Sequence, residues 1–278
     1  MIVFLNGAFV PEEEATISVF DRGFVYSDGL FETLRLYHGR PFRWEDHWER
    51  LRRGAEFLKI RPPFSSTGLF AHVGELVTRN GLPESVLRIV LSRGVGQRGY
   101  SPKGADQPVL VMSLHPAPSS HAGQPLQWRL ATSSLRLAAD DPLAGFKTCS
   151  KLRHVLARAE AEENGADEAL LLNTAGDVVE ATSGNLFWIQ DQTVCTPPLD
   201  SGALPGVTRL VIVELCQSMG WPFQETRLRR DGLYHVEGAF LTMSTLEVVE
   251  VLALDGRDLA RSPLTARLHR AYRELVCA

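Results

Sequence analysis

The alternation of strands and helices in this chain stops once and then starts again. Up to about residue 115, two hairpins precede two helices and two strands, and the first turn carries Asn6-Gly7, a strong hairpin signal. Residues 116–125 contain three prolines and no large apolar side chain, and strand and helix patterns resume after them. A chain of 278 residues is long enough for two domains. We therefore predict an α+β fold with a smaller N-terminal domain (1–115), an interdomain linker (116–125) and a larger C-terminal domain (126–278).

Composition narrows the possible functions. The 29 basic and 33 acidic residues give a net charge of −4, which disfavours a nucleic-acid partner. The N-terminus lacks a basic flank and no apolar run approaches the roughly 20 residues that span a bilayer, so we expect neither a secretory signal nor a membrane segment. The four cysteines show no CxxC spacing and the histidines no HExxH pattern, so we expect reduced thiols, no metal site and a cytoplasmic location.

A glycine pattern at residues 94–99 imitates a dinucleotide-binding motif. It fits GxGxxG and follows a predicted strand, but neither a helix start nor an acidic residue about 20 positions later accompanies it. We interpret it as a loop that presents Arg93, Arg98 and Tyr100, with the guanidinium groups suited to a substrate carboxylate. A solvated basic turn explains the same spacing equally well.

Lysine is rare in this sequence, so chemistry that needs a primary amine has four candidates, which are Lys59, Lys103, Lys147 and Lys151. Lys147 lies at a predicted strand-to-helix junction beside Phe146, where partial desolvation would favour a nucleophilic amine. Lys151 begins a helix whose apolar stripe, which we expect to face the core, consists of Leu152, Val155, Leu156 and Ala159. We therefore expect Lys151 to face solvent and favour Lys147.

Three further features suit an anionic, ring-containing ligand. Glu180 lies in an apolar strand and needs a cationic partner unless it occupies an edge. Leu204-Pro205-Gly206 precedes a helix whose first residues, Val207 and Thr208, offer backbone N–H groups and a hydroxyl to a phosphate, although an ordinary helix start looks the same. Ser244-Thr245 follows another apolar strand, and Arg50 could add a permanent positive charge.

Together these features resemble the class IV (fold type IV) pyridoxal-phosphate enzymes, which include branched-chain and D-amino-acid transaminases and 4-amino-4-deoxychorismate lyase. The resemblance extends over nearly the whole chain. Its most specific parts are ISVFDRGFVYSDGLFETLRLYHGRPFRWEDHWERL, FK ahead of the helix, VVEATSGNLFW and LPGVTR. It implies a two-domain α+β fold, a homodimer acting on a small-molecule substrate, and pyridoxal 5'-phosphate in the cleft between the domains.

The resemblance also implies roles for residues. Lys147 would bind the cofactor covalently and move the proton, and Glu180 would hold the pyridine nitrogen protonated. The phosphate would be bound by Arg50, Val207, Thr208, Ser244 and Thr245.

Within the family, the lyases resemble this chain most, through SRGVGQRGYS and the stretch NGADEALLLNTAGDVVEATSGNLFW. Thr33 falls where the lyase has a threonine thought to act on the leaving enolpyruvyl group, so the resemblance implies conversion of 4-amino-4-deoxychorismate to p-aminobenzoate and pyruvate in folate biosynthesis. Met243 stands where the lyases often have asparagine, and FETLR is shared with transaminases. A transaminase acting on D-amino acids or branched-chain L-amino acids, with 2-oxoglutarate or pyruvate, therefore stays open, as does a binding protein without chemistry.

Overall fold

The computed structural model describes residues 1–118 and 123–277. Contacts within the chain divide it into two compact units. The first contains Met1–Pro118 together with Phe146–Ser150, and the second contains the described remainder. The units differ from the predicted domain ranges, because residues 146–150, which include Lys147, belong to the first unit, and the described residues of the predicted linker are divided between the two units. Part of the predicted linker, residues 119–122, lies outside the described residues.

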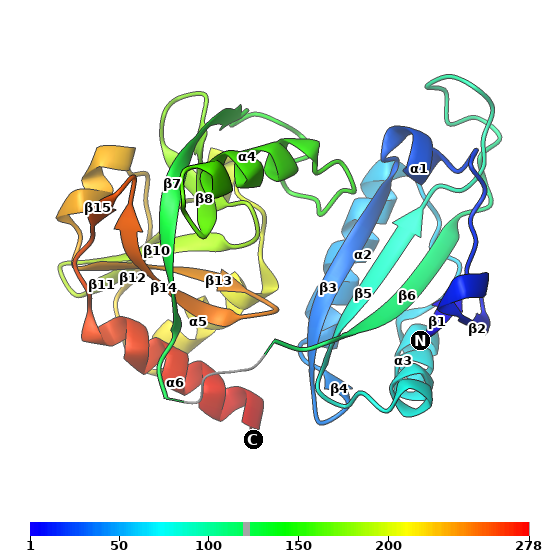
Figure 1. Ribbon diagram of the computed structural model, residues 1–278, viewed down its shortest axis with the longest axis horizontal. Helices are drawn as coiled ribbons and strands as arrows, with labels where there is room; N and C mark the ends of the chain where they lie inside the picture. The colour runs from blue at the N-terminus through cyan, green and yellow to red at the C-terminus, as the bar shows by residue number, and fades with distance from the viewer. Residues whose placement is uncertain (119–122, 278) are drawn as a thin grey trace. The chain divides into compact units, whose positions relative to one another are not determined.

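The first unit is a six-stranded sheet with two long helices packed against it. The strand order is β2-β1-β6-β5-β3-β4, and Figure 1 shows β3, β5 and β6 running side by side. Leu51 and Ala55 of α2 and Leu69 of α3 are buried with apolar residues of the sheet in one cluster. The elements are β1 (Ile2–Leu5), β2 (Ala8–Pro11), η1 (Glu12–Glu14), α1 (Arg22–Tyr26), β3 (Gly29–Tyr37), β4 (Arg40–Pro41), α2 (Trp44–Leu58), α3 (Ser66–Asn80), β5 (Ser85–Ser92) and β6 (Val109–Pro116).

The turns of this unit follow from residues that tolerate positive φ. Asn6 and Gly7 have φ of 49° and 99°, and His38 and Gly39 have φ of 52° and 79°. Both pairs join antiparallel strands, as the sequence predicts.

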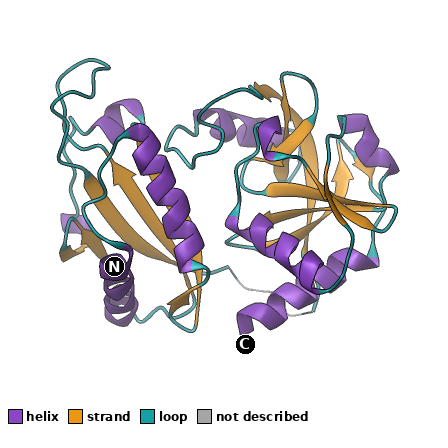
Figure 2. Ribbon diagram, turned by 180° about the vertical axis from the view of Figure 1, so that it is seen from behind, coloured by secondary structure: helices purple, strands orange, loops and turns teal. Residues whose placement is uncertain are grey.

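The second unit is built around a sheet that closes on itself. Its strand order is β12-β11-β10-β13-β14-β7-β8-β9, and β9 also pairs with β10 through Glu180 and Asn185. That pair closes a ring of six strands, whose curvature is visible in Figure 2. The elements are β7 (Leu126–Leu137), α4 (Leu152–Glu163), β8 (Glu168–Asn173), β9 (Val178–Ala181), β10 (Asn185–Gln190), β11 (Thr193–Thr196), η2 (Leu199–Ser201), α5 (Val207–Ser218), β12 (Phe223–Glu225), η3 (Arg230–His235), β13 (Gly238–Met243), β14 (Glu247–Leu254), β15 (Arg257–Asp258) and α6 (Pro263–Cys277).

The predicted core face of α4 is wrong. Leu152, Val155 and Leu156 are exposed, whereas Ala157 and Ala161 are buried against β7 and β8. Small alanines let the helix approach the sheet closely, which turns the larger apolar residues outward. The sequence pattern identified an apolar stripe on the helix, but it did not identify which face of the helix packs against the sheet of this unit.

Candidate functional site

Lys147 is fixed beside β3 by backbone pairing. The Phe31 N–H donates to the Lys147 carbonyl at 2.9 Å, and the Cys149 N–H donates to the Gly29 carbonyl at 2.9 Å. Leu30 and Thr148 form an antiparallel bridge between these two bonds. A short segment that follows a loop in the sequence therefore lies against an inner strand of the first unit, and its lysine has a defined position.

The Lys147 amine lies near an aromatic ring and a second cation. Its Nζ is 4.6 Å from the centre of the Phe31 ring, and the guanidinium carbon of Arg88 is 3.6 Å from the same centre. Phe146, the neighbour expected to desolvate the amine, stacks instead on Phe57 at 4.5 Å. Lys147 itself is half-buried, and the Phe31 ring lies beside its amine.

Arg50 is held by a buried carboxylate on β3. Its Nε and Nη2 donate to the two oxygens of Glu32 at 2.8 and 2.7 Å, and His47 Nδ1 lies 2.7 Å from Glu32 Oε2. Burial alone would raise the pKa of Glu32, but the charges and hydrogen bonds of Arg50 and His47 outweigh it and hold this pKa far below its ordinary value. Burial lowers the pKa of His47. Its contact with Glu32 opposes this shift, but Arg50 and Lys147 add to it, so the pKa of His47 lies below its ordinary value. Glu32 is therefore an anion that orients Arg50 and also contacts His47.

Replacing Glu32 with glutamine is expected to destabilise the protein by about 3–5 kcal/mol, since it leaves a buried arginine without its anion. The depressed pKa of Glu32 stabilises the fold above pH ~4.3, and this contribution is lost as the pH falls below that value. The acid-induced loss of stability should therefore be smaller in the variant. Urea unfolding from pH 7 to pH 3 measures both effects.

Glu75→Gln, which breaks an exposed pair with Arg79, is the control and should change stability by less than about 1 kcal/mol. Equal effects of the two substitutions would contradict the role given to Glu32.

The second unit presents a buried carboxylate with one oxygen already bound. Glu180 Oε2 accepts the Leu204 N–H at 3.0 Å and the Asn185 side-chain amide at 3.3 Å. Its other oxygen, Oε1, lies 3.8 Å from His154 Nε2. Both hydrogen bonds go to Oε2, so Oε1 is the oxygen that can meet a protonated ring nitrogen.

The start of α5 is a candidate phosphate site. Gly206 is the N-cap residue, and no side chain caps the helix. The backbone N–H groups of the first turn therefore lie at the positive end of the helix dipole without a side-chain acceptor. Val207 and Thr208 occupy the first turn and are buried. A Cβ at Gly206 would lie 1.9 Å from Asn185 Oδ1, so only glycine fits there. Ser244 and Thr245 form the half-buried turn between β13 and β14.

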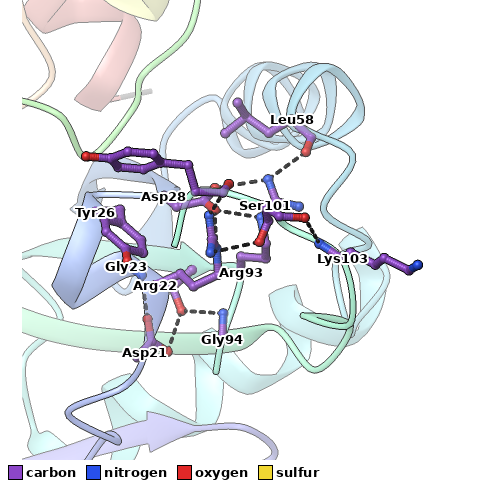
Figure 3. A network of polar contacts seen from close by, with 12 residues as sticks. Asp21, Arg22, Gly23, Tyr26, Asp28, Leu58, Arg93, Gly94, Ser101 and Lys103 are labelled. Carbon is purple, nitrogen blue, oxygen red and sulfur yellow. Dashed lines mark hydrogen bonds and ion pairs between the residues drawn. The ribbon is translucent and has the colours of Figure 1, made fainter. Parts of the chain in front are cut away.

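The arginine loop has a different construction from the one predicted. Arg93 is buried, donates to both oxygens of Asp28 at 2.7 and 3.0 Å, and also donates to the Leu58 carbonyl at 2.8 Å (Figure 3). Burial opposes ionisation of Asp28, yet hydrogen bonds from Arg93 and Arg22 hold its pKa below the ordinary value. These contacts favour a structural role for Arg93 over the predicted contact with substrate.

Arg98 and Tyr100 are exposed on this loop, and Arg22 fixes its shape. The buried Arg22 guanidinium donates to the carbonyls of Gly99, Tyr100 and Ser101 at 2.9–3.1 Å. Arg22 therefore holds the backbone of the loop, while the two side chains predicted to contact substrate are exposed.

Several residues near these sites were not predicted from the sequence. Arg88 lies on β5, donates to the Thr33 hydroxyl at 3.1 Å, and has its pKa lowered by burial. A single arginine in the apolar run SVLRIVLS was the available signal. Glu32 and His47 gave no signal of their own, because their importance depends on pairing with Arg50. The same holds for His154 and Asn185 beside Glu180.

The groups present fit pyridoxal phosphate. Taken separately, the first unit supplies a half-buried amine and an oriented arginine, and the second supplies a buried carboxylate, whose Oε1 lies 3.8 Å from His154 Nε2, and a helix start without a side-chain cap. An aldehyde, an anionic phosphate and a pyridine nitrogen require these partners. Within the described ranges, no three His, Cys, Asp or Glu side chains form a group suited to a metal ion. None of the helices in the described part of the chain has the length and hydropathy to cross a membrane.

Comparison with known proteins agrees with this chemistry. The family model for amino-transferase class IV matches residues 29–254. An aminodeoxychorismate lyase of Bacillus subtilis is 30% identical over 89% of this chain and 85% of its own, and a D-alanine aminotransferase of Staphylococcus aureus is 29% identical over 99% and 97%. A crystal structure of the T.th. branched-chain amino acid aminotransferase with pyridoxamine 5'-phosphate superposes with a TM-score of 0.90 at 30% identity, covering 99% of this chain and 93% of that one.

The family model matches most of the sequence, and the solved structure matches nearly the whole fold. The predicted two-domain α+β class is confirmed. The chain belongs to the class IV aminotransferase family of pyridoxal-phosphate enzymes, which act on small-molecule substrates.

Proposed function

We propose that this protein is a pyridoxal-phosphate lyase that converts 4-amino-4-deoxychorismate to p-aminobenzoate and pyruvate. The observation that carries the proposal is the hydrogen bond from Arg88 to Thr33. Arginine has no acceptor, so the Thr33 oxygen accepts and its own O–H remains to be donated elsewhere. A hydroxyl donor that lies two residues from Phe31, the contact of Lys147, suits protonation of a leaving oxygen.

The proposed cofactor-binding residues come from both units. Lys147 would bind the aldehyde carbon, Glu180 would hold a proton at the pyridine nitrogen through Oε1, and Arg50, Val207, Thr208, Ser244 and Thr245 would bind the phosphate. When bound, the cofactor supplies an electron sink for charge that develops on the substrate.

The proposed chemistry then requires two proton transfers by side chains. The Lys147 amine removes the proton from the amine-bearing ring carbon, and the Thr33 hydroxyl donates toward the oxygen of the departing enolpyruvyl group. Loss of that group as pyruvate gives an aromatic ring, which makes the elimination strongly favourable. Catalysis therefore depends on positioning more than on a strong acid or base.

Substrate binding is proposed for Arg88, Arg98 and Tyr100. Arg88 is a half-buried cation whose guanidinium lies over the Phe31 ring, which Lys147 also contacts, so it suits a carboxylate of the substrate. Arg98 and Tyr100 stay as proposed contacts on the loop held by Arg22. Arg93 is left out, because Asp28 and the Leu58 carbonyl already bind it.

A transaminase acting on D-amino acids or branched-chain L-amino acids is the second candidate. Its support is the similarity to a D-alanine aminotransferase and to a branched-chain aminotransferase structure, each over 99% of this chain. The same residues serve this reaction, but Lys147 would return its proton instead of assisting the loss of a substituent.

We also propose a homodimer in the cytoplasm. Leu152, Val155 and Leu156 of α4 are 69%, 61% and 52% exposed on one helix face, and Phe24 of the first unit is 71% exposed. Large exposed apolar side chains at helical spacing suit a protein contact surface. All four cysteines are free thiols, which suits a reducing compartment.

A coupled assay tests the lyase. With an aminodeoxychorismate synthase, chorismate and glutamine, the protein should form p-aminobenzoate well above the synthase-only background, measured by chromatography. Thr33→Val, which keeps the shape of the side chain but removes the donor, should lower kcat by about 10²-fold with little change in stability. The matched control is Thr67→Val, a change of an exposed threonine at the start of α3.

No product above background would contradict the lyase. Conversion of the bound cofactor to its amine form by D- or branched-chain L-amino acids, followed by absorbance, would then support the transaminase. If Thr33→Val and Thr67→Val behave alike in an active lyase, Thr33 has no part in the elimination.

A further inference from the structure

Asn185 lies where β9 and β10 pair and so close the ring of six strands in the second unit. It is the first residue of β10, and it pairs with Glu180 of β9 and with Thr242 of β13. It is 6% exposed, so its amide must find partners within the protein. The strand pairing alone therefore brings a buried amide beside a buried carboxylate.

The amide group of Asn185 makes two hydrogen bonds that converge on one backbone turn. Its nitrogen donates to Glu180 Oε2 at 3.3 Å and to the Leu204 carbonyl at 2.8 Å. The Leu204 N–H donates to the same Glu180 oxygen at 3.0 Å. The carboxylate, the amide and both polar groups of Leu204 thus form a closed set of contacts.

The other atom of the amide touches the start of α5. The Asn185 oxygen occupies the space that a Cβ of Gly206 would need, with only 1.9 Å between them. Gly206 is the N-cap of the helix whose first N–H groups are the proposed phosphate contacts. One side chain therefore contacts both the carboxylate and the helix start.

We infer that Asn185 is a positioning residue for the cofactor, because its amide joins the Glu180 carboxylate to the turn that leads into α5. It directs Glu180 so that Oε2 is bound by the protein and Oε1 is presented to the pyridine nitrogen. It also fixes Leu204, and through it the N-terminus of α5, at a constant separation from that carboxylate. The inference rests on the proposed role of Glu180 and not on the choice between lyase and transaminase.

Asn185→Ala removes both hydrogen bonds and should weaken pyridoxal phosphate binding about tenfold, as measured by titration of the apoprotein. In the loaded protein, the pH midpoint of the cofactor absorbance band should move in the same direction as in Glu180→Gln, since both changes weaken the hold on the pyridine proton. Asn80→Ala is the matched control. Asn80 bonds the backbone of Ile2 and Leu76 in the first unit, so its loss should lower the melting temperature but leave both cofactor readouts unchanged.

A double substitution tests the contact with α5. Gly206→Ala alone should weaken cofactor binding more than tenfold, because the new methyl group collides with the Asn185 oxygen. In the Asn185→Ala background the nearest remaining contact of that methyl group is Arg209 Cβ at 3.4 Å, which is ordinary packing. The effect of Gly206→Ala should therefore fall at least fivefold in that background.

The substitutions have three outcomes that would overturn the inference and one that would support it. If Asn185→Ala lowers only the melting temperature, as Asn80→Ala does, the inference is overturned. An equal effect of Gly206→Ala in both backgrounds also overturns it. If the absorbance midpoint does not move in Glu180→Gln either, the role of Glu180 fails and the inference fails with it. A moved midpoint in Asn185→Ala together with suppression in the double variant supports it.

Discussion

Replacing Lys147 with alanine is expected to lower kcat by about 10³-fold or more and to leave a colourless protein after gel filtration. In the proposed site this residue supplies both the covalent bond to the cofactor and the amine that moves the proton, so the substitution would remove two functions at once. Steady-state kinetics and the absorbance spectrum of the purified protein measure the two effects. The melting temperature should change little, because Lys147 is half-buried and its segment is held to β3 by backbone bonds.

Lys151→Ala is the control for this experiment. Lys151 is four residues further along the chain, where it precedes α4, and it is equally half-buried. The Lys151→Ala protein should retain the bound cofactor and most of the activity. A yellow Lys147→Ala protein beside a colourless Lys151→Ala protein would show that the wrong lysine was assigned.

Glu180→Gln is expected to lower kcat by about 10²-fold and to weaken cofactor binding. The glutamine keeps the size of the side chain but removes the negative charge that, in the proposed site, stabilises a protonated ring nitrogen. Kinetics at saturating cofactor separate the catalytic effect from the binding effect. Glu250→Gln changes another buried carboxylate of the same unit, one bound to Arg261, and should lower stability without a comparable loss of kcat. Equal losses of kcat in both variants would remove Glu180 from the catalytic set.

Local signals explain why the sequence predicts so much of this protein. Lys147 stands out because lysine is rare, and Glu180 stands out because a carboxylate interrupts an apolar strand. The Leu204-Pro205-Gly206 turn indicates a helix start that the structure confirms at Val207. The family resemblance then implies a cofactor-binding role for each of these features.

The remaining features depend on contacts between residues distant in the sequence. Pairing with β3 assigns residues 146–150 to the first unit, which no local pattern reveals. Arg93 resembles a substrate contact in the sequence because its partner Asp28 is 65 residues away. The pattern of VVEATSGNLFWIQ predicts one strand, but the turn at 182–184 folds it into β9 and β10 and so places Asn185 beside Glu180.

The direct test of the central claim is to map the lysine that carries the cofactor. The native loaded protein is reduced with borohydride, digested, and analysed by mass spectrometry for a phosphopyridoxyl group. We expect this group on Lys147, in the peptide that begins after Arg136 and ends at Lys151 when cleavage at the modified lysine is blocked. A phosphopyridoxyl group on Lys59, Lys103 or Lys151, with Lys147 unmodified, would contradict the account.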